Sequence, residues 1–485
     1  MRCFERMRAA VVAGALAWVV VMAGGCTTTP TSPSNRPPAP PAPEEVQRVQ
    51  AILDRWVEAL GGVAVLEKLR GLEVRAVVEV AGGGPTFNLH TWQTLENFYR
   101  SELLFSNGTT LIEAYDGKVA WRRSSALGFG FVPAGELETT LRRNSIRAAL
   151  NLRADYPDRR LLPDREVGGR RCHGVSLTPR TGGPERMFFD AENGRLLRAE
   201  RWPVEGVTAT EVYEFFDYRD VGGMMLSNEM KVQSPEGVYT IRRLETVPNP
   251  LVGSALWTPP AEALREGLRV ARILDRYVEA GGGSAPLERI RTRVTEQEIE
   301  IPASGLKYRA TLSQKLPNLM VVEQNLPGLG RMTQGFDGTT GWTNSEVQGY
   351  RVLKGAELRQ LADNADLRAN ARLPERCPLR VWLGPREVEG KRTIALALAT
   401  MQGPAGIFYF SEDDGHLVRV ESGVTAGQEG ALSVVFDFSD FRAVDGVVMP
   451  FATKATNPAI TTVMRVVSVK HNVPLDDAIF KPRTE

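Results

Sequence analysis

The sequence is poor in the residue types on which most catalytic and metal sites depend. It has four histidines and four cysteines among 485 residues. None of the motifs HExxH, paired CxxC, GxSxG, GxGxxG or the Walker loop occurs in it. The 59 basic and 58 acidic residues nearly balance, so charge gives no reason to expect a nucleic-acid partner. We therefore expect a protein that is not an enzyme and has no catalytic residue, no metal and no other cofactor.

The first 25 residues have the layout of a secretory signal peptide. Three arginines precede an uncharged run from residue 9 to residue 25, which is shorter than the roughly 20 residues that span a bilayer. A permanent transmembrane helix is the competing interpretation. Small residues stand directly before Cys26, an arrangement that resembles the lipobox of bacterial lipoproteins, although Ala23 replaces the usual Leu. We expect cleavage and lipid attachment at Cys26; an ordinary signal peptide with an incidental cysteine is the alternative.

Residues 26–43 are predicted to form an extended tether. The 17 residues after Cys26 include seven prolines, which build no core and reach about 50 Å in a polyproline-like conformation. Thr27 follows the cysteine, and in lipoproteins of Gram-negative bacteria this resembles an address for the outer membrane. The N-terminus thus predicts a lipid-anchored protein at the periplasmic face of an outer membrane.

The remainder of the chain is an internal duplication with an offset of 221 residues. Residues 51–69 and 272–290 share 12 identities in 19 positions, against roughly one expected from average amino-acid usage. The same offset places Trp121 on Trp342, and it drifts to 223 where Trp257 meets Phe480. We predict two domains, 44–260 and 261–485, each with its own core.

Each repeat opens with an amphipathic helix and continues as strands. Apolar residues between 46 and 60 fall at helical spacing, and residues 72–80 alternate with period two. Asn193-Gly194 and its counterpart Asp414-Gly415 predict hairpin turns. Helical segments at residues 135–152 and 355–371 interrupt the strands. The pattern predicts an α+β fold in which a curled antiparallel sheet carries one helix at its start and others inserted midway.

This order of elements resembles the outer-membrane lipoprotein-sorting superfamily of LolA and LolB. The resemblance is carried by ILDRYVEAGGG, by Pro317-Asn318, by YDG or FDG followed by Trp, and by the late segments DFRAVDGVVMPF and NVPLDDAIFKP. It implies two tandem unclosed antiparallel β-barrels, each covered by inserted lid helices and enclosing an apolar cavity for acyl chains. Unlike the named transporters, this chain carries two copies.

The resemblance suggests aromatic and aliphatic residues as the lining of such a cavity. Candidates in the two repeats are Trp92, Phe98, Trp121, Leu319, Val321 and Trp342. Ordinary core packing explains them equally well, because sequence does not separate an apolar lumen from an apolar core.

Other recurring or reactive residues favour structural roles. Asp116 and Asp337 recur, but each precedes glycine, and Asp-Gly is typical of a tight turn. None of the histidines recurs at the repeat offset. Cys172 and Cys377 occupy positions that do not match, so two free or buried thiols are expected instead of a disulfide.

The sequence therefore predicts a non-catalytic lipoprotein that binds or transfers lipid, or the acyl chains of another lipoprotein. The alternative is an envelope sensor or scaffold of the RseB type, which regulates a partner protein. The ligand, the direction of transfer, the number of binding repeats and the oligomeric state are left open by the sequence.

Overall fold

The computed structural model describes residues 41–482 except 182, 202–210, 235–236, 329, 348, 402 and 426–430. The predicted signal peptide, Cys26 and nearly all of the tether lie outside these residues. The chain divides into two compact units, which we call unit 1 (Met1–Leu264 with Met401–Gly403) and unit 2 (Arg265–Thr400 with Pro404–Glu485). The domain limits predicted from the sequence stay predictions. In the described part of the chain, no helix is both long and apolar enough to span a membrane.

Unit 1 begins with helix α2, Pro43–Ala59, and the short helix α3, Val63–Leu66. The side chains of Val49, Leu53 and Val57 are buried, as expected for one face of a helix with four-residue spacing. Gly61 ends α2 at φ 118°, and a Cβ there would stand 2.2 Å from the carbonyl oxygen of Gly223. Only glycine fits this close approach of the helix end to the sheet.

The strands of unit 1 form one antiparallel sheet in the order β6-β5-β4-β3-β2-β1-β13-β12-β11-β10-β9-β8-β7. Strands β6 and β7 are the two edges and do not pair with each other, so the sheet is unclosed. The bounds are β1 Gly71–Val80, β2 Thr86–Thr94, β3 Tyr99–Phe105, β4 Thr110–Tyr115, β5 Ala120–Ser124, β6 Gly128–Phe131, β7 Asp158–Val167, β8 Arg170–Thr178, β9 Glu185–Asp190, β10 Leu196–Arg201, β11 Glu211–Val221, β12 Met224–Ser234 and β13 Gly237–Pro248.

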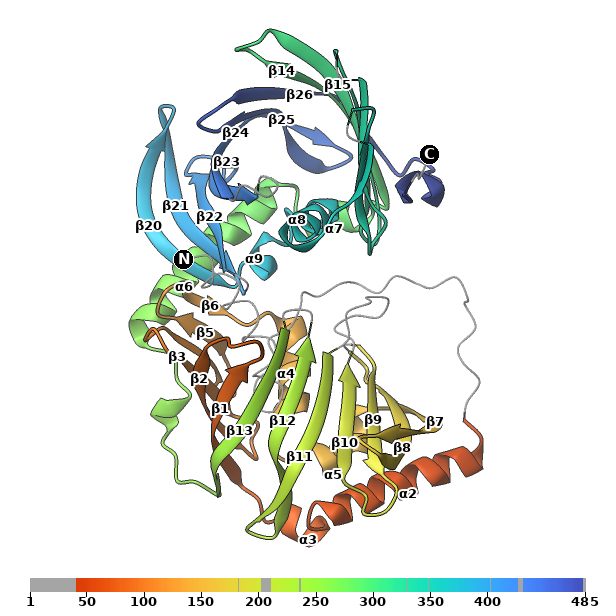
Figure 1. Cartoon of the computed structure of the whole chain (residues 1–485). Coiled ribbons are helices and arrows are strands. Elements are labelled where there is room, and N and C mark those ends of the chain that lie inside the picture. Colours follow the sequence, from red (N-terminus) through yellow and green to blue (C-terminus); the bar gives the residue numbers. More distant parts are fainter. Residues whose placement is uncertain are drawn as a thin grey trace. The chain divides into compact units, whose positions relative to one another are not determined.

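Two helices, α4 (Ala134–Asn144) and α5 (Ala148–Asp155), are inserted between the edge strands β6 and β7. They lie against the sheet on the side toward which it curls (Figure 1). The predicted helical interruption is thus confirmed, as two helices. The unit ends in a single turn of 3-10 helix, η2, at Ser254–Leu256.

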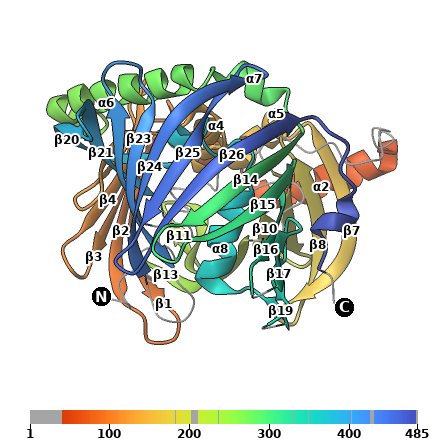
Figure 2. The same ribbon diagram turned by 90° about the horizontal axis from the view of Figure 1, so that it is seen from above.

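Unit 2 repeats this arrangement. Its sheet runs β22-β23-β24-β25-β26-β14-β15-β16-β17-β18-β19, with the hairpin β20-β21 beside β22, and it curls around α8 (Figures 1 and 2). The helices are α6 Ala261–Ala280, α7 Ser284–Glu288, α8 Gly355–Ala365, α9 Leu373–Arg376 and the 3-10 turn η4 Asp477–Phe480. The strands are β14 Thr292–Ile301, β15 Leu306–Lys315, β16 Leu319–Leu326, β17 Gly330–Phe336, β18 Gly341–Ser345, β19 Gly349–Val352, β20 Leu379–Val388, β21 Lys391–Thr400, β22 Gly403–Ser411, β23 Leu417–Thr425, β24 Ala431–Val444, β25 Val447–Thr456 and β26 Thr461–His471.

The first helix of each unit holds a hairpin turn through an arginine that recurs in the sequence. Arg55 on α2 donates to the carbonyl of Ala191 at 2.9 Å and also to that of Glu192. Arg276 on α6 donates to the carbonyls of residues 412 and 413 at 2.7 and 2.6 Å. These turns contain the predicted Asn193-Gly194 and Asp414-Gly415 steps. Both hairpins are therefore confirmed.

Candidate functional site

Each sheet has an inner face, which carries the helices, and an outer face. Alternate residues of a strand point to opposite faces, so the helix contacts assign every strand position. In unit 1, Arg122 on β5 bonds Glu136 of α4, so Arg122 lies on the inner face. Glu113, its register partner on β4, lies on the same face. In unit 2, Met320 and Phe336 pack with residues of α8 and define the inner face there. The space beneath α4 and beneath α8 is the candidate functional site of each unit.

Beneath α4, unit 1 contains a fully buried ionic group. The guanidinium of Arg122 is 0% exposed and bonds both Glu113 and, at 2.5 Å, Glu136 of α4. The Tyr99 hydroxyl donates to Glu113 at 2.8 Å. Burial and the charge of Glu113 raise the pKa of Tyr99, so its hydroxyl stays protonated and able to donate. Charges buried this deeply are tolerated only because each has its partner.

A second buried ionic group holds the other end of α4. Glu185 on β9 accepts from Arg143 at 3.1 Å, from Tyr156 at 3.0 Å and from Arg201 on β10 at 3.0 Å. Burial by itself would raise the pKa of Glu185, but the guanidiniums of Arg201, Arg143 and Arg142 lower it to about 2. The carboxylate is therefore ionised, and α4 is fixed to the sheet by charge at both ends.

Beneath α8, unit 2 is mainly apolar instead, and Gln314 and Asn318 add uncharged hydrogen bonds to the α8 carbonyl oxygens of residues 364 and 362 at 3.1 and 3.2 Å. Leu361 and Ala365 of the helix are buried with Met320, Phe336 and Leu353. A second apolar cluster lies under α6, where Leu274 packs with Phe408, Phe410 and neighbouring strand residues. Contacts of this kind are non-directional. A long apolar ligand could therefore replace the side chains of α8 against the strands without leaving a buried charge unpaired.

The difference between the units is encoded position by position at the offset of 221. Glu113 and Arg122 correspond to Gln334 and Thr343, while the inner-face residues Tyr99 and Ser101 correspond to Met320 and Val322. On the inserted helix, Thr140 and Asn144 correspond to Leu361 and Ala365. The counterpart of Glu136 is Glu357, which pairs at 2.8 Å with the half-exposed Arg351. The ionic groups of unit 1 are thus absent from the matching positions of unit 2.

The structure places Trp121 and Trp342, two of the predicted lining residues, on the outer faces. The Trp121 indole donates to the carbonyl oxygen of Trp257, next to η2, at 2.8 Å. The Trp342 indole donates to that of Phe480, in η4, at 3.0 Å. Both indoles are buried, at 1% and 0% exposure. Each therefore fastens the last segment of its repeat to the sheet.

Three of the other four predicted lining residues lie near these two. Leu319 and Val321 pack with Trp342 and Phe480. The Phe98 ring is 6.1 Å from that of Trp257. Trp92 shares the outer face with Trp121, because the register joins Trp92, Arg100, Ala114 and Trp121 across four strands. The structure thus groups Leu319 and Val321 with Trp342, and Phe98 with Trp257 beside Trp121, whereas Trp92 lies three strands from Trp121 on the same face; contact of the six with a ligand stays a prediction.

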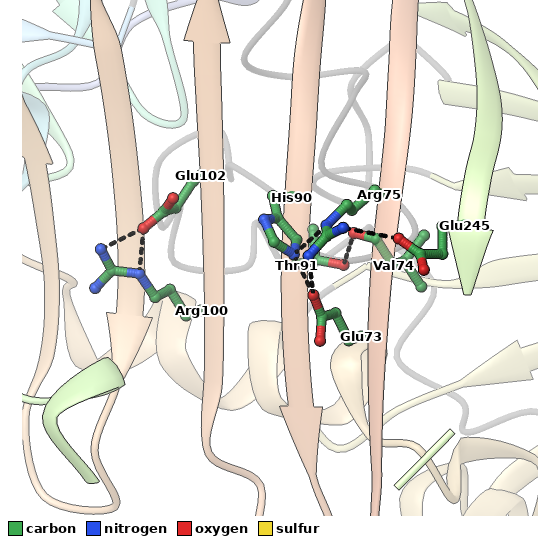
Figure 3. Close-up of polar contacts among 8 residues, drawn as sticks. All are labelled: Glu73, Val74, Arg75, His90, Thr91, Arg100, Glu102 and Glu245. Atoms are coloured by element: carbon green, nitrogen blue, oxygen red, sulfur yellow. Dashed lines mark hydrogen bonds and ion pairs between the residues drawn. The ribbon is translucent and has the colours of Figure 1, made fainter. Parts of the chain in front are cut away.

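The outer face of unit 1 carries a group of charged residues on β1, β2 and β13 (Figure 3). His90, whose ring centroid is 3.6 Å from that of Trp92, contacts the Glu73 carboxylate at 2.7 Å. Arg75 bridges Glu73 at 3.1 Å and Glu245 at 2.8 Å (Figure 3). Pairs with this exposure contribute little to stability, about 0–1 kcal/mol each. The surface around Trp92 is therefore typical of a solvated sheet face.

The remaining residues singled out by the sequence have structural partners. The Asp116 carboxylate accepts the backbone N–H groups of Lys118 and Val119 at 2.9 and 2.7 Å. Asp337 does the same for residues 339 and 340, so the turn interpretation is confirmed. Cys172 and Cys377 are free and buried, as predicted. Burial raises the pKa of both thiols, that of Cys377 to about 11.

Three histidines contact single carboxylates. The pairs are His90 with Glu73, His173 with Asp164 and His471 with Asp445, at 2.7, 3.0 and 2.9 Å. The ring of His416 stacks on Phe441 at 4.1 Å. Among the residues that the structure describes, no three His, Cys, Asp or Glu side chains gather as a metal site would require.

Unit 2 also has a cleft of about 300 Å³. Its lining includes Glu389 and Lys391 from the turn of β20-β21, together with Asp437, Lys454 and Arg465 from β24 to β26. Lys454 lies 3.8 and 3.9 Å from Glu389 and Asp437. Since both signs of charge are present and partly paired, the cleft does not select one class of ligand.

Sequence reasoning missed the inner-face residues of both units. Period-two alternation separates two faces of a strand but does not say which of them the helices cover. Arg122, Arg143 and Arg201 resemble ordinary surface arginines in the sequence. The repeat does not single them out either, since Arg100 and its counterpart Val321 differ in the same way and lie on the outer face.

No protein-family model and no curated protein matches the sequence. A solved LolA superfamily protein from Nitrosomonas europaea matches 44% of this chain and 97% of its own, with 13% identity and a TM-score of 0.33. A DUF1329 family protein from Desulfovibrio piger matches 43% of this chain and 97% of its own, with 14% identity and a TM-score of 0.33. The MucA/MucB complex of Pseudomonas aeruginosa matches 87% of this chain and 99% of its own, with 12% identity and a TM-score of 0.18. The LolA superfamily, to which the sequence shows a resemblance, is thus also among the matched solved structures.

Proposed function

We propose that this protein is an exported, lipid-anchored, non-catalytic binder of acyl chains, either of a lipid or of a lipoprotein, at the periplasmic face of an outer membrane. The anchor would be Cys26, followed by the proline-rich tether. The binding surface would be the inner face of unit 2. The apolar cluster beneath α8 is the observation that carries the proposal.

An acyl chain fits this face because its burial is favourable by about 0.8 kcal/mol per CH₂ and requires few placed polar groups. The chain would take the place of Leu361 and Ala365 against Met320 and Phe336, which exchanges one apolar contact for another. In unit 1 the same movement would separate Arg122 from Glu136 and would leave buried charges unpaired. The proposal therefore assigns acyl-chain binding to unit 2.

The test exchanges strand residues that lie beneath the inserted helix. Leu312 and Val322 pack against the cluster beneath α8, and their counterparts in unit 1 are Thr91 and Ser101. In the mature chain with Cys26→Ser, the variant Leu312→Thr/Val322→Ser should bind a fluorescent fatty acid about tenfold more weakly. The reciprocal variant Thr91→Leu/Ser101→Val should bind as the parent does, with circular dichroism confirming that each is folded.

Native mass spectrometry of the parent should show co-purified lipid. A parent protein that carries no lipid and takes up no fatty acid would contradict the proposal. Equal affinities of the parent and the unit 2 variant would instead contradict the assignment to the inner face of unit 2.

A further inference from the structure

Among the residues that the structure describes, buried polar atoms without a hydrogen-bond partner gather between α4 and the inner face of unit 1. We call this region the polar seam. On α4 and its end they belong to Thr140, Arg142 and Asn144, and on the strands to Ser101, Arg122 and Arg201. A buried group without a partner costs about 1–3 kcal/mol, and folded proteins contain few of them. Several of them in one seam indicate that a polar occupant belongs there.

Arg142 is the clearest member of the seam. Its side chain is buried, with 9% exposure, and neither Nε nor Nη2 has an acceptor. The guanidinium lies 5.4 Å above the Tyr156 ring. It forms no ion pair with any residue that the structure describes. Burial raises the pKa of Asp155, and the charge of Arg142 offsets this only in part. Within the described residues, Arg142 therefore has two buried donor nitrogens without an acceptor.

Arg201 adds a third unpaired nitrogen from the facing strand. Its Nε is bonded to Glu185 at 3.0 Å, but its Nη1 has no partner. The charges of Arg142 and Arg201 both act on Glu185, so the two guanidiniums lie on the same part of the inner face. The Glu185 carboxylate already accepts three hydrogen bonds. It does not supply further acceptors for these nitrogens.

We propose that the polar seam of unit 1 binds an oxyanion, a carboxylate or phosphate group, with Arg142 as its principal donor. A guanidinium binds such groups through paired N–H donors in one plane, more strongly than it binds neutral acceptors. Thr140 and Asn144 lie one turn apart on the same helix, and their hydroxyl and amide are further buried donors of the seam. This site is independent of the apolar face of unit 2 and of its proposed function.

The corresponding positions of unit 2 show that the seam is specific to unit 1. Thr140, Arg142 and Asn144 are matched there by Leu361, Asp363 and Ala365. None of these could donate to an anion. Unit 2 is therefore the internal comparison for any measurement of anion binding.

The test uses isothermal titration of the mature chain with Cys26→Ser. Three probes separate the sources of the anion: inorganic phosphate, lysophosphatidic acid, and a monoacylglycerol with the same chain length. Arg142→Met should weaken binding of the phosphate-bearing probe at least tenfold and leave the monoacylglycerol unchanged. Arg153→Met, on the exposed side of α5, is the charge-matched control and should change neither.

Each outcome has one meaning. Arg142-dependent binding of inorganic phosphate supports the proposal with a free anion as ligand, and binding of lysophosphatidic acid alone supports it with a lipid head group. Equal binding of both phosphate probes to the parent and to Arg142→Met, or no binding at all, overturns it, and the seam is then filled by water. Since Arg142 leaves no buried carboxylate behind, the variant should fold, and a thermal melt checks this. Failure of the monoacylglycerol to bind bears only on the proposed function of unit 2.

Discussion

The inserted helix is held in opposite ways in the two units. In unit 1, α4 is fixed by buried ion pairs at both ends, from Arg122 to Glu136 and from Arg143 to Glu185. In unit 2, α8 rests on apolar side chains, and its one conserved glutamate, Glu357, faces a half-exposed arginine. Ion pairs require one geometry, whereas apolar contacts tolerate many. One inserted helix is thus held by buried ion pairs, and the other by apolar contacts and uncharged hydrogen bonds from Gln314 and Asn318.

Some framework contacts, by contrast, have stayed alike. Arg198 pairs with Glu214 at 2.7 Å in unit 1, and Arg419 pairs with Asp437 at 2.6 Å at the matching place in unit 2. The same holds for the arginines that hold the hairpin turns. The outer ion pairs of Glu73 and Arg75 have not been kept, since the matching residues are Val294 and Glu296.

The largest expected effect is the loss of Arg122. Arg122→Met leaves Glu113 and Glu136 buried without a cation, which should destabilise unit 1 by about 3–5 kcal/mol. Hydrogen exchange measured at increasing urea concentration reports the unfolding transitions of unit 1 and unit 2 separately. Thr343→Val, at the matching position of unit 2, is the control and should change stability by under about 1 kcal/mol. Similar losses in both variants would mean that the ionic group does not distinguish the units.

Acid should also separate the units. The pKa of Glu185 is about 2 in the folded state against a usual value of 4.5, so its contribution is complete above pH 4.5 and is lost as the pH falls toward 2. That contribution amounts to roughly 3 kcal/mol. Its counterpart in unit 2 at the offset of 221 is Gly406. Unfolding of unit 1 should therefore become easier between pH 4.5 and 2 by a larger amount than unfolding of unit 2.

Glu185→Gln provides the check on this pH effect. The glutamine amide is uncharged and does not titrate. The variant should therefore lose the ion pairs of Glu185 at neutral pH and be less stable there, and the stability of its unit 1 should depend less on acid. If the parent and the variant followed the same curve below pH 4.5, another group would have to be responsible.

The smallest expected effect is one that both units should share. Trp121→Phe and Trp342→Phe each remove one indole N–H bond to a backbone carbonyl at nearly the same distance, 2.8 and 3.0 Å. Each should cost about 1–2 kcal/mol, partly because a buried acceptor loses its partner. Thermal melts of the two single variants measure this. Effects that differ by more than twofold would show that the outer framework has also diverged.

The framework was predictable from sequence and the inner faces were not. The helix at the start of each repeat, the strand at residues 72–80 and the Asp116 and Asp337 turns follow from local spacing and turn chemistry. The partners of Arg122, Arg143 and Arg201 lie on other strands or on α4, between 9 and 42 residues away along the chain. Their pairing depends on the curl of the sheet. The tryptophans illustrate the same limit, since their recurrence was visible but the face they occupy was not.

The bond from each indole to the end of its own repeat has a consequence for the origin of the protein. The indole N–H of Trp121 donates to a carbonyl 136 residues later in the chain, and that of Trp342 to one 138 residues later. A copy that stopped before Trp257 or Phe480 would leave the buried indole N–H without this acceptor and a hydrophobic surface uncovered. The ancestral gene segment that was copied must therefore have included this closing turn. During synthesis, the Trp121 bond of the first repeat can form only after residue 257 has been added.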